Sequence, residues 1–230
     1  MKTFELNNLK SKYSEIVGPH QDQHIVHFGT ILDDAKAVLI MIHGRGASAH
    51  DILSLAYEID AADTAYIAPQ AKNNSWYPYS FLSPIEQNEP GLSSGLAVID
   101  STIKMLLKKG FSSEQIYLLG FSQGACLSLE YAARNPNKFG GVIGLSGGVI
   151  GETINQHDYS GNLEGTEIFL GCSNVDPHIP LQRVNETEEV FRNLGAKVTK
   201  RIYEGMAHTV NQDEIDFVNT LMKEKISDNF

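Results

Sequence analysis

Short apolar runs alternate with amphipathic stretches along most of this chain. The apolar runs predict strands at residues 37–42, 64–68, 116–119, 141–145, 167–171 and 198–203. Between them, apolar residues recur at intervals of three and four, which predicts helices at 51–61, 92–107, 125–133 and 181–194, and a C-terminal helix through residues 215–222. Strands that alternate with helices favour an α/β fold, in which a mostly parallel sheet is covered by helices on both faces.

The sequence also predicts an edge strand, the limits of one helix and the number of domains. Residues 24–29 predict an antiparallel edge strand near the start of the chain. Ser93 or Ser94 is the expected cap of the helix at 92–107, and Gly110 is expected to end it. No repeat, linker or low-complexity tract interrupts the pattern, so residues 1–230 are expected to form a single domain.

Residues 120–124 read Gly-Phe-Ser-Gln-Gly, a Gly-x-Ser-x-Gly pentapeptide between an expected strand and an expected helix. In this context the pentapeptide is typical of a nucleophile elbow, a tight turn that presents a serine hydroxyl beside the N-terminus of a helix. A plain glycine-rich turn would show the same letters, so other residues must decide. Because a serine hydroxyl is a weak nucleophile at neutral pH, Ser122 needs a base and an acid that orients the base.

On sheets of this kind the chain order is serine, then acid, then histidine, with the last two in loops after later strands. Asp176 directly follows an expected strand, whereas no strand leads into its rival, Asp158. His208 lies between the last strand and the last helix, and His178 is too close in sequence to Asp176 to serve as the base. A turn aspartate and a helix-start histidine are the structural alternatives. We expect Ser122, Asp176 and His208 to be catalytic and His178 to line the pocket.

An acyl-transfer site also needs N–H donors for the oxyanion. The Gln123 amide is one expected donor, and the Arg45 amide is the other, because His43-Gly44-Arg45-Gly46 follows an expected strand as oxyanion loops do. His43 is expected to hold this loop through a hydrogen bond, and both His43 and Gly44 are expected at the substrate site. The Arg45 side chain is either solvated or placed to meet an anionic group of the substrate.

Two long segments, 70–90 and 147–165, lack periodicity. The first contains four aromatic residues close together. They are Trp76, Tyr77, Tyr79 and Phe81. Aromatic side chains often cover the edge of a core, and they also wall apolar substrate pockets. Both readings stay open, with Trp76 and Tyr77 as the expected substrate-binding members.

Composition narrows the class of protein. The chain has 230 residues, 42% hydrophobic content and a formal net charge of −10. This acidic balance argues against nucleic acid or an anionic membrane surface as the main partner. No apolar run is long enough to span a bilayer, and no signal region is present, which favours the cytoplasm. The oligomeric state stays open, and a homodimer is one assembly that the sequence allows.

Cysteine and histidine spacing gives no sign of a metal site. Cys126 and Cys172 are the two cysteines, and both are expected to be structural. His20, His24 and His27 lack a metal-ligand spacing and more often belong to a surface or a strand. We expect neither a metal nor another cofactor.

Together these motifs resemble the phospholipase/carboxylesterase family, which includes bacterial carboxylesterases and eukaryotic acyl-protein thioesterases. The resemblance rests on His43-Gly44-x-Gly46, Trp76, Gly-Phe-Ser-Gln-Gly, Asp176 before a proline, and Gly205-x-x-His208. It implies an α/β-hydrolase fold with little or no lid, and hydrolysis of carboxylic esters or thioesters without a cofactor. It also implies the same catalytic triad and amide donors.

The chain departs from the thioesterase branch, which usually has a small or apolar residue at Arg45, Trp-Phe-Asp at residues 76–78 and often glycine at Ala125. These departures favour a small-ester carboxylesterase, with a bias toward acidic or aromatic esters. An acyl thioesterase or lysophospholipase that acts on longer chains is the alternative. A non-catalytic ligand-binding module is a third hypothesis, since a fold by itself does not set function.

Overall fold

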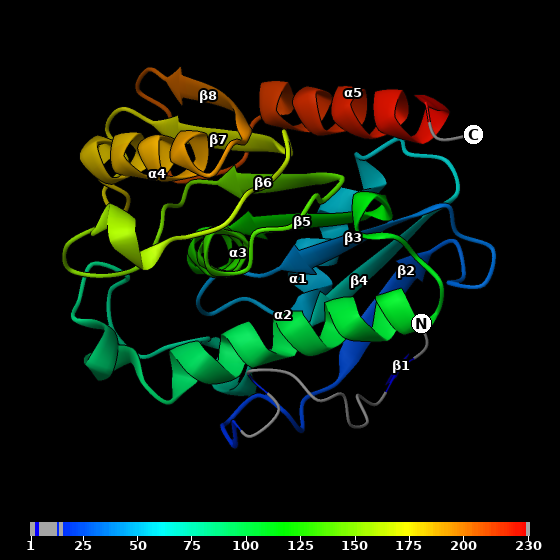
Figure 1. Ribbon diagram of the computed structural model, residues 1–230, viewed down its shortest axis with the longest axis horizontal. Helices are drawn as coiled ribbons and strands as arrows, with labels where there is room; N and C mark the ends of the chain where they lie inside the picture. The colour runs from blue at the N-terminus through cyan, green and yellow to red at the C-terminus, as the bar shows by residue number, and fades with distance from the viewer. Residues whose placement is uncertain (1–2, 5–12, 14–15, 229–230) are drawn as a thin grey trace.

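A central sheet, drawn in Figure 1, organises the part of the chain that the computed structural model describes, residues 3–4, 13 and 16–228. Its strands are β1 (Thr3–Phe4), β2 (Ile25–Gly29), β3 (Ala37–Ile42), β4 (Thr64–Pro69), β5 (Ile116–Phe121), β6 (Gly141–Leu145), β7 (Glu167–Ser173) and β8 (Lys197–Tyr203). They lie in the order β1-β2-β4-β3-β5-β6-β7-β8. Strands β3 to β8 run parallel, while β2 is antiparallel to β4 and β1 is antiparallel to β2.

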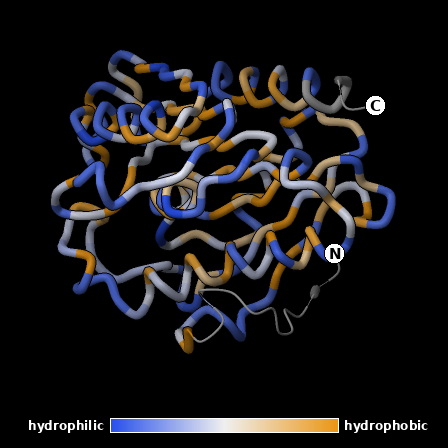
Figure 2. The backbone as a smooth tube through the Cα atoms, in the orientation of Figure 1, coloured by the Kyte–Doolittle hydropathy of each residue, from blue (hydrophilic) through white to orange (hydrophobic). Residues whose placement is uncertain are grey.

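Helices cover both faces of this sheet because strand side chains alternate between two cores. In β3, Val38, Ile40 and Ile42 belong to one core, and Leu39 and Met41 belong to the other. The first core packs under α2 (Gly91–Lys108), α3 (Gln123–Arg134) and α4 (Leu181–Asn193). The second packs under α1 (Ala49–Leu53) and α5 (Gln212–Asp228). Figure 2 shows the hydrophobic positions gathered along the central strands and on the inner sides of the helices.

Several ends of elements differ from expectation. The helix expected at 51–61 is α1 followed by a tighter 3-10 turn, Ser54–Tyr57, and it starts earlier because Ser48 and Asp51 form a capping box. The strand expected at the edge, β2, is antiparallel as predicted, but β1 lies outside it.

Helix α2 begins without a serine cap, because it starts at Gly91, directly after Pro90. Ser94 instead accepts a hydrogen bond from the backbone N–H of His20 (2.9 Å) and fastens the N-terminal segment to the helix. Gly110 follows the helix in a left-handed conformation (φ +101°), as expected of a helix-ending glycine.

The topology selects one place for a ligand. The chain passes from β3 to β4 on one side, and then returns to place β5 on the other side of β3. Ligands of open α/β sheets bind at such a reversal, beyond the carboxyl ends of the strands. The loops after β3 and β5 flank this point, and they carry Arg45 and Ser122. No helix in the described ranges is both long and apolar enough to cross a membrane.

Candidate active site

Ser122 sits on a sharp turn between β5 and α3. Its backbone has φ +55° and ψ −119°, a conformation that side-chain-bearing residues rarely adopt. A Cβ at Gly120 would lie 2.2 Å from the carbonyl oxygen of Gly124, and one at Gly124 would lie 2.0 Å from that of Ile42. The turn therefore closes only because both flanking positions are glycine, which is the physical content of the Gly-x-Ser-x-Gly pattern.

Ser122, His208 and Asp176 form a hydrogen-bonded series. The Ser122 hydroxyl lies 2.9 Å from Nε2 of His208, and Nδ1 of His208 lies 2.7 Å from Oδ2 of Asp176. The three residues come from the ends of β5, β7 and β8, and the Phe121 ring packs beside the histidine with centroids 5.0 Å apart. The arrangement has the order and spacing that serine hydrolases use to activate a hydroxyl.

Asp176 is held as a carboxylate although its side chain is fully buried. Burial by itself would raise its pKa, but hydrogen bonding to His208 and to the backbone N–H groups of His178 and Ile179 holds the pKa below its ordinary value. A buried negative charge next to Nδ1 fixes the tautomer that leaves Nε2 free to accept the serine proton. The rival, Asp158, is exposed in the 3-10 turn Gln156–Asp158 and accepts a hydrogen bond from Asn155.

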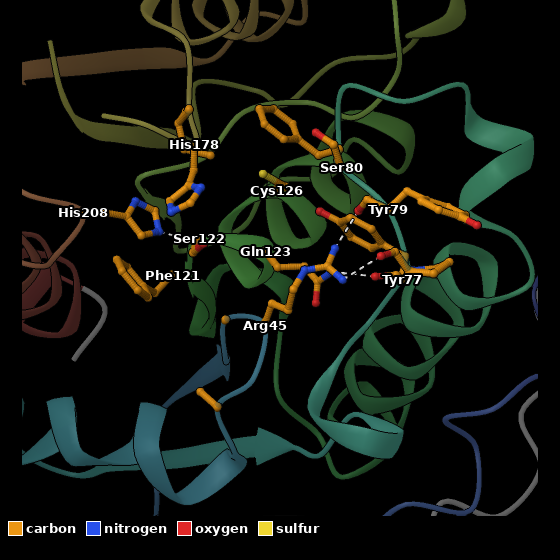
Figure 3. A pocket seen from close by; sticks show the side chains of 15 residues that line it. Arg45, Tyr77, Tyr79, Ser80, Phe121, Ser122, Gln123, Cys126, His178 and His208 are labelled. Atoms are coloured by element: carbon orange, nitrogen blue, oxygen red, sulfur yellow. Dashed lines mark hydrogen bonds between the residues drawn. The ribbon is translucent and has the colours of Figure 1, made fainter. Parts of the chain in front are cut away.

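His178 lies beside this series rather than in it. Its ring meets the His208 ring edge-on, with centroids 4.9 Å apart, and it lines the cavity above Ser122. In Figure 3 the two histidines stand together on one side of the cavity.

The backbone amides expected to bind an oxyanion, those of Arg45 and Gln123, belong to the two segments that meet at the elbow. A Cβ at Gly44 would come within 3.3 Å of the Phe121 carbonyl oxygen and 3.4 Å of Ser122 Cβ, so the loop after β3 lies directly against the elbow. Gln123 is the first residue of α3, where N–H groups have no partner inside the helix. Within the described chain, neither the Arg45 N–H nor the Gln123 N–H donates a hydrogen bond.

His43 and Trp76 brace this loop from behind. Nδ1 of His43 donates to the Gly44 carbonyl (2.8 Å) and Nε2 accepts from the Ala71 N–H (3.1 Å), while burial lowers the pKa of His43. The Trp76 indole N–H donates to the His43 carbonyl (2.9 Å). Both side chains are fully buried, and neither is among the described residues that line the cavity. Of the residues expected at the substrate site, Gly44, Tyr77 and His178 do line it.

The segment 75–81 forms the wall of the cavity across from His178 and His208. The side chains of Gln123, Asn88 and Arg45 hold this wall by hydrogen bonds to its backbone. The side-chain amide of Gln123 accepts a hydrogen bond from the Trp76 N–H (2.8 Å) and donates one to the Tyr77 carbonyl (2.9 Å). Asn88 accepts from the Tyr79 N–H (2.9 Å) and donates to the Ser80 carbonyl (2.8 Å).

Arg45 donates to the carbonyls of Pro78 (2.8 Å) and Tyr79 (2.6 Å). The Arg45 side chain is therefore not simply solvated, and no carboxylate among the described residues pairs with it.

The cavity between these parts measures about 610 Å³. Its lining, drawn in Figure 3, combines polar groups with aromatic and apolar side chains: Arg45, Ser122, Gln123, His178, His208, Tyr77, Tyr79, Phe81, Phe121, Cys126 and Ile179 among others. The aromatic cluster is divided, because Tyr77, Tyr79 and Phe81 line the cavity while Trp76 packs in the core.

The sequence did not identify Cys126, which lines the cavity, or Asn88, which holds the wall by hydrogen bonds to Tyr79 and Ser80. The signal for Cys126 was its place in the first turn of the helix that follows Ser122, close to the nucleophile in sequence. Asn88 had no detectable signal, since it lies in a loop without periodicity.

Neither cysteine is poised as a nucleophile, because burial raises the pKa of both thiols to about 12. Across the described residues no group of three or more His, Cys, Asp or Glu side chains is placed to hold a metal ion. His20 instead bonds the Trp76 carbonyl through Nε2 (2.9 Å).

Comparison with known proteins shows the family of this chain. The model of the phospholipase/carboxylesterase family matches residues 30–226. The chain belongs to the phospholipase/carboxylesterase family. It is therefore a hydrolase with the α/β-hydrolase fold, of the esterase and acyl thioesterase kind.

Among solved structures, a phospholipase/carboxylesterase from Dyadobacter fermentans is 41% identical. Its TM-score is 0.86, and the match covers 91% of this chain and all of that one. Among family relatives, acyl-protein thioesterase 1 of Saccharomyces cerevisiae is 26% identical over 85% of this chain and 96% of its own length. That of Kluyveromyces lactis is 30% identical over 82% and 92%. The proteins similar to this chain thus include one described as a phospholipase/carboxylesterase and two described as acyl-protein thioesterases.

Proposed function

We propose that this chain is a serine carboxylesterase that hydrolyses small or medium carboxylic esters through an acyl-enzyme. The observation that carries the proposal is the series Ser122–His208–Asp176, with separations of 2.9 and 2.7 Å, at the floor of a cavity. The cavity's size falls in the ordinary range for small-molecule sites, about 300–1,000 Å³.

Acylation begins when Nε2 of His208 takes the Ser122 proton and Oγ attacks the ester carbonyl carbon. Negative charge moves to the carbonyl oxygen, where the Arg45 and Gln123 N–H groups stabilise it. The tetrahedral intermediate collapses, the ester C–O bond breaks, and the protonated His208 gives its proton to the departing alcohol. Asp176 stays ionised throughout and stabilises the imidazolium.

Deacylation repeats these steps with water as the nucleophile. His208 takes one proton from water, the hydroxyl oxygen attacks the acyl carbon, and the proton returns to Ser122 Oγ as the acyl bond breaks. One ester and one water yield one acid and one alcohol, with no electron transfer.

The second candidate is an acyl thioesterase or lysophospholipase acting on longer chains. The similarity to two fungal acyl-protein thioesterases favours it. Chain-length preference separates the two, because a short acyl pocket rejects long chains.

The test is hydrolysis of p-nitrophenyl esters from acetate to palmitate by the wild type and by Ser122→Ala. We expect turnover of short chains that is lost in the variant, together with fluorophosphonate labelling of the wild type only. Preference for palmitate would favour the second candidate. Turnover retained by Ser122→Ala would overturn both, and absence of labelling and turnover would point to a ligand-binding module.

A further inference from the structure

The Arg45 guanidinium stands out among the arginines of this chain. The other four each form an ion pair with a carboxylate: Arg134 with Glu130, Arg183 with Glu186, Arg192 with Glu188 and Arg201 with Asp213. In the described residues Arg45 has no carboxylate partner, although it lines the cavity that contains Ser122. Its charge is therefore uncompensated at the place where substrate would bind.

The guanidinium is nevertheless held in a fixed position. Nη1 donates to the Pro78 carbonyl (2.8 Å) and to Ser75 Oγ (3.2 Å), and Nη2 donates to the Tyr79 carbonyl (2.6 Å). The group also lies over the Tyr77 ring, 5.8 Å from its centroid. These contacts use neutral oxygens and an aromatic face, which orient a guanidinium without neutralising it.

The remaining donors fit a carboxylate. A guanidinium has five N–H groups, and three are used, which leaves the Nε–H and one Nη2–H. Nε and Nη2 form one edge of the planar fork, and two N–H groups on one edge match the two oxygens of a carboxylate.

The charge around the cavity favours the same ligand. The chain carries a formal net charge of −10, yet the cavity's described lining includes no aspartate or glutamate. Asp176, behind His208, is fully buried and already bonded to His208 and two backbone amides. A positive pocket in an acidic protein attracts anions selectively to the pocket.

The alcohol and acyl portions of a bound ester lie on opposite sides of Ser122. His208 delivers its proton to the leaving alcohol, so the alcohol portion must lie toward His208. In Figure 3 Ser122 lies between His208 on one side and Arg45 on the other. The acyl portion therefore extends toward Arg45, along a wall that includes Tyr77, Phe81 and Cys126.

We propose that Arg45 binds a carboxylate at the far end of the acyl chain, so that the preferred substrates are half-esters of dicarboxylic acids. This inference rests on the proposed esterase function. The apolar wall takes the methylene chain, Ser122 attacks the ester carbonyl, and the free carboxylate pairs with the Nε–H and Nη2–H of Arg45.

A purely structural role for Arg45 predicts something different. If the side chain only braces residues 78–79, its loss would slow hydrolysis of charged and neutral esters by the same factor. If it binds a carboxylate, its loss would slow the charged esters more. The ratio of kcat/KM for a charged ester to that for a neutral ester separates the two roles.

The experiment compares the monomethyl esters of succinic, glutaric and adipic acids with methyl esters of neutral acids matched in chain length, by pH-stat. The proteins are the wild type, Arg45→Gln, Arg45→Lys and the control Lys72→Gln, which removes one charge from the same loop region outside the cavity. An acetate ester with a carboxylate on its alcohol portion tests the opposite side of the site.

We expect the wild type to prefer at least one half-ester by on the order of tenfold, the worth of a charge-assisted hydrogen bond. Arg45→Gln should lower that ratio by on the order of tenfold, and Arg45→Lys should retain part of it. Lys72→Gln should change it by less than about threefold, because an exposed charge outside the cavity is screened.

Three outcomes would overturn the proposal: no half-ester preference in the wild type, an equal loss on both substrate classes in Arg45→Gln, or a preference only for the alcohol-side carboxylate. A binding readout keeps the inference separate from the proposed catalysis. Monomethyl glutarate and monomethyl adipate should raise the melting temperature of Ser122→Ala but not of Ser122→Ala with Arg45→Gln. If the two variants differ in this way but the wild type hydrolyses no ester, the esterase function alone is contradicted. If the two variants do not differ in melting temperature, the Arg45 site is contradicted.

Discussion

The two sides of the cavity are held in place by different means. On one side, Ser122, Asp176 and His208 stand at the ends of β5, β7 and β8 and are positioned by backbone next to them. Asp176, for example, is oriented by N–H groups two and three residues further along. On the other side, the wall at 75–81 is fastened by side chains from distant parts of the chain, including Gln123.

This difference separates what each side contributes. The catalytic side follows from strand ends and a turn that only glycine permits, so its geometry is largely set by the fold. The wall depends on individual hydrogen bonds from Arg45, Asn88 and Gln123, each of which could be replaced without altering the sheet. We therefore expect changes on the catalytic side to reduce kcat, and changes on the wall to alter substrate binding.

The largest effect is expected at Asp176. In Asp176→Asn the amide carries no charge to stabilise the imidazolium and no longer fixes the tautomer of His208, so kcat on a neutral ester should fall by about 10⁴-fold. Asp158→Asn is the matched control and should retain near wild-type kcat, because Asp158 is exposed in a loop. Equal losses in the two variants would contradict the assignment.

A smaller effect is expected at Asn88, on the wall. Asn88→Ala removes one acceptor and one donor for the backbone of Tyr79 and Ser80, so this part of the wall is held less firmly. KM should rise by about tenfold, and the free energy of unfolding should fall by about 2 kcal/mol. Steady-state kinetics and urea unfolding measure the two quantities.

Asn219 provides a control of the same chemistry. Its amide accepts from the Asp60 N–H (2.7 Å) and donates to the Glu58 carbonyl (3.1 Å), on α5 and away from the cavity. Asn219→Ala should lower stability without changing KM. A similar rise in KM in Asn88→Ala and Asn219→Ala would show that substrate binding depends on the overall stability of the protein rather than on the wall.

The smallest effect on activity is expected at Glu214, a buried carboxyl that contrasts with Asp176. Glu214 and Asn211 cap the start of α5 by bonding each other's backbone N–H, which closes the loop that carries His208. The other carboxyl oxygen, Oε1, is buried and makes no hydrogen bond to the described residues. Burial raises the pKa of Glu214 to about 7.

That shift makes stability depend on pH with a definite sign. Because the folded chain holds this proton more tightly than the unfolded chain, the contribution to stability is fully present below about pH 4.5 and is lost as pH rises through about 7. The loss is about 3 kcal/mol. Glu214→Gln cannot ionise, so from pH 4.5 to pH 8 its unfolding free energy should gain about this amount relative to wild type. Urea unfolding at both pH values checks it, and parallel pH profiles would contradict it.

The sequence predicted the structure most accurately where local geometry determines it. The strands at 37–42 and 141–145 agree with β3 and β6 to the residue, because apolar runs this short, bounded by turn residues, are typical of buried strands. The start of α1 was less predictable, because a capping box begins the helix before the apolar periodicity does. The helix at 92–107 agrees with α2 within one residue at each end, but the serine cap was wrong, because Ser94 bonds the His20 N–H instead. Ser122, Asp176 and His208 were identified by chain order and come together in space, and their catalytic roles remain a proposal.

The amino-acid sequence by itself determined the alternating α/β order, the glycine-flanked turn at Ser122 and the order of the three residues at the strand ends. These depend on periodicity, on the absence of a Cβ and on chain direction, all of which are local. Only the tertiary structure decided that Trp76 lies in the core while Tyr77 lines the cavity, that Asn88 supports the wall, and that Arg45 has no carboxylate partner among the described residues. Those outcomes depend on which side chains meet across long separations in sequence, and no local pattern specifies such encounters.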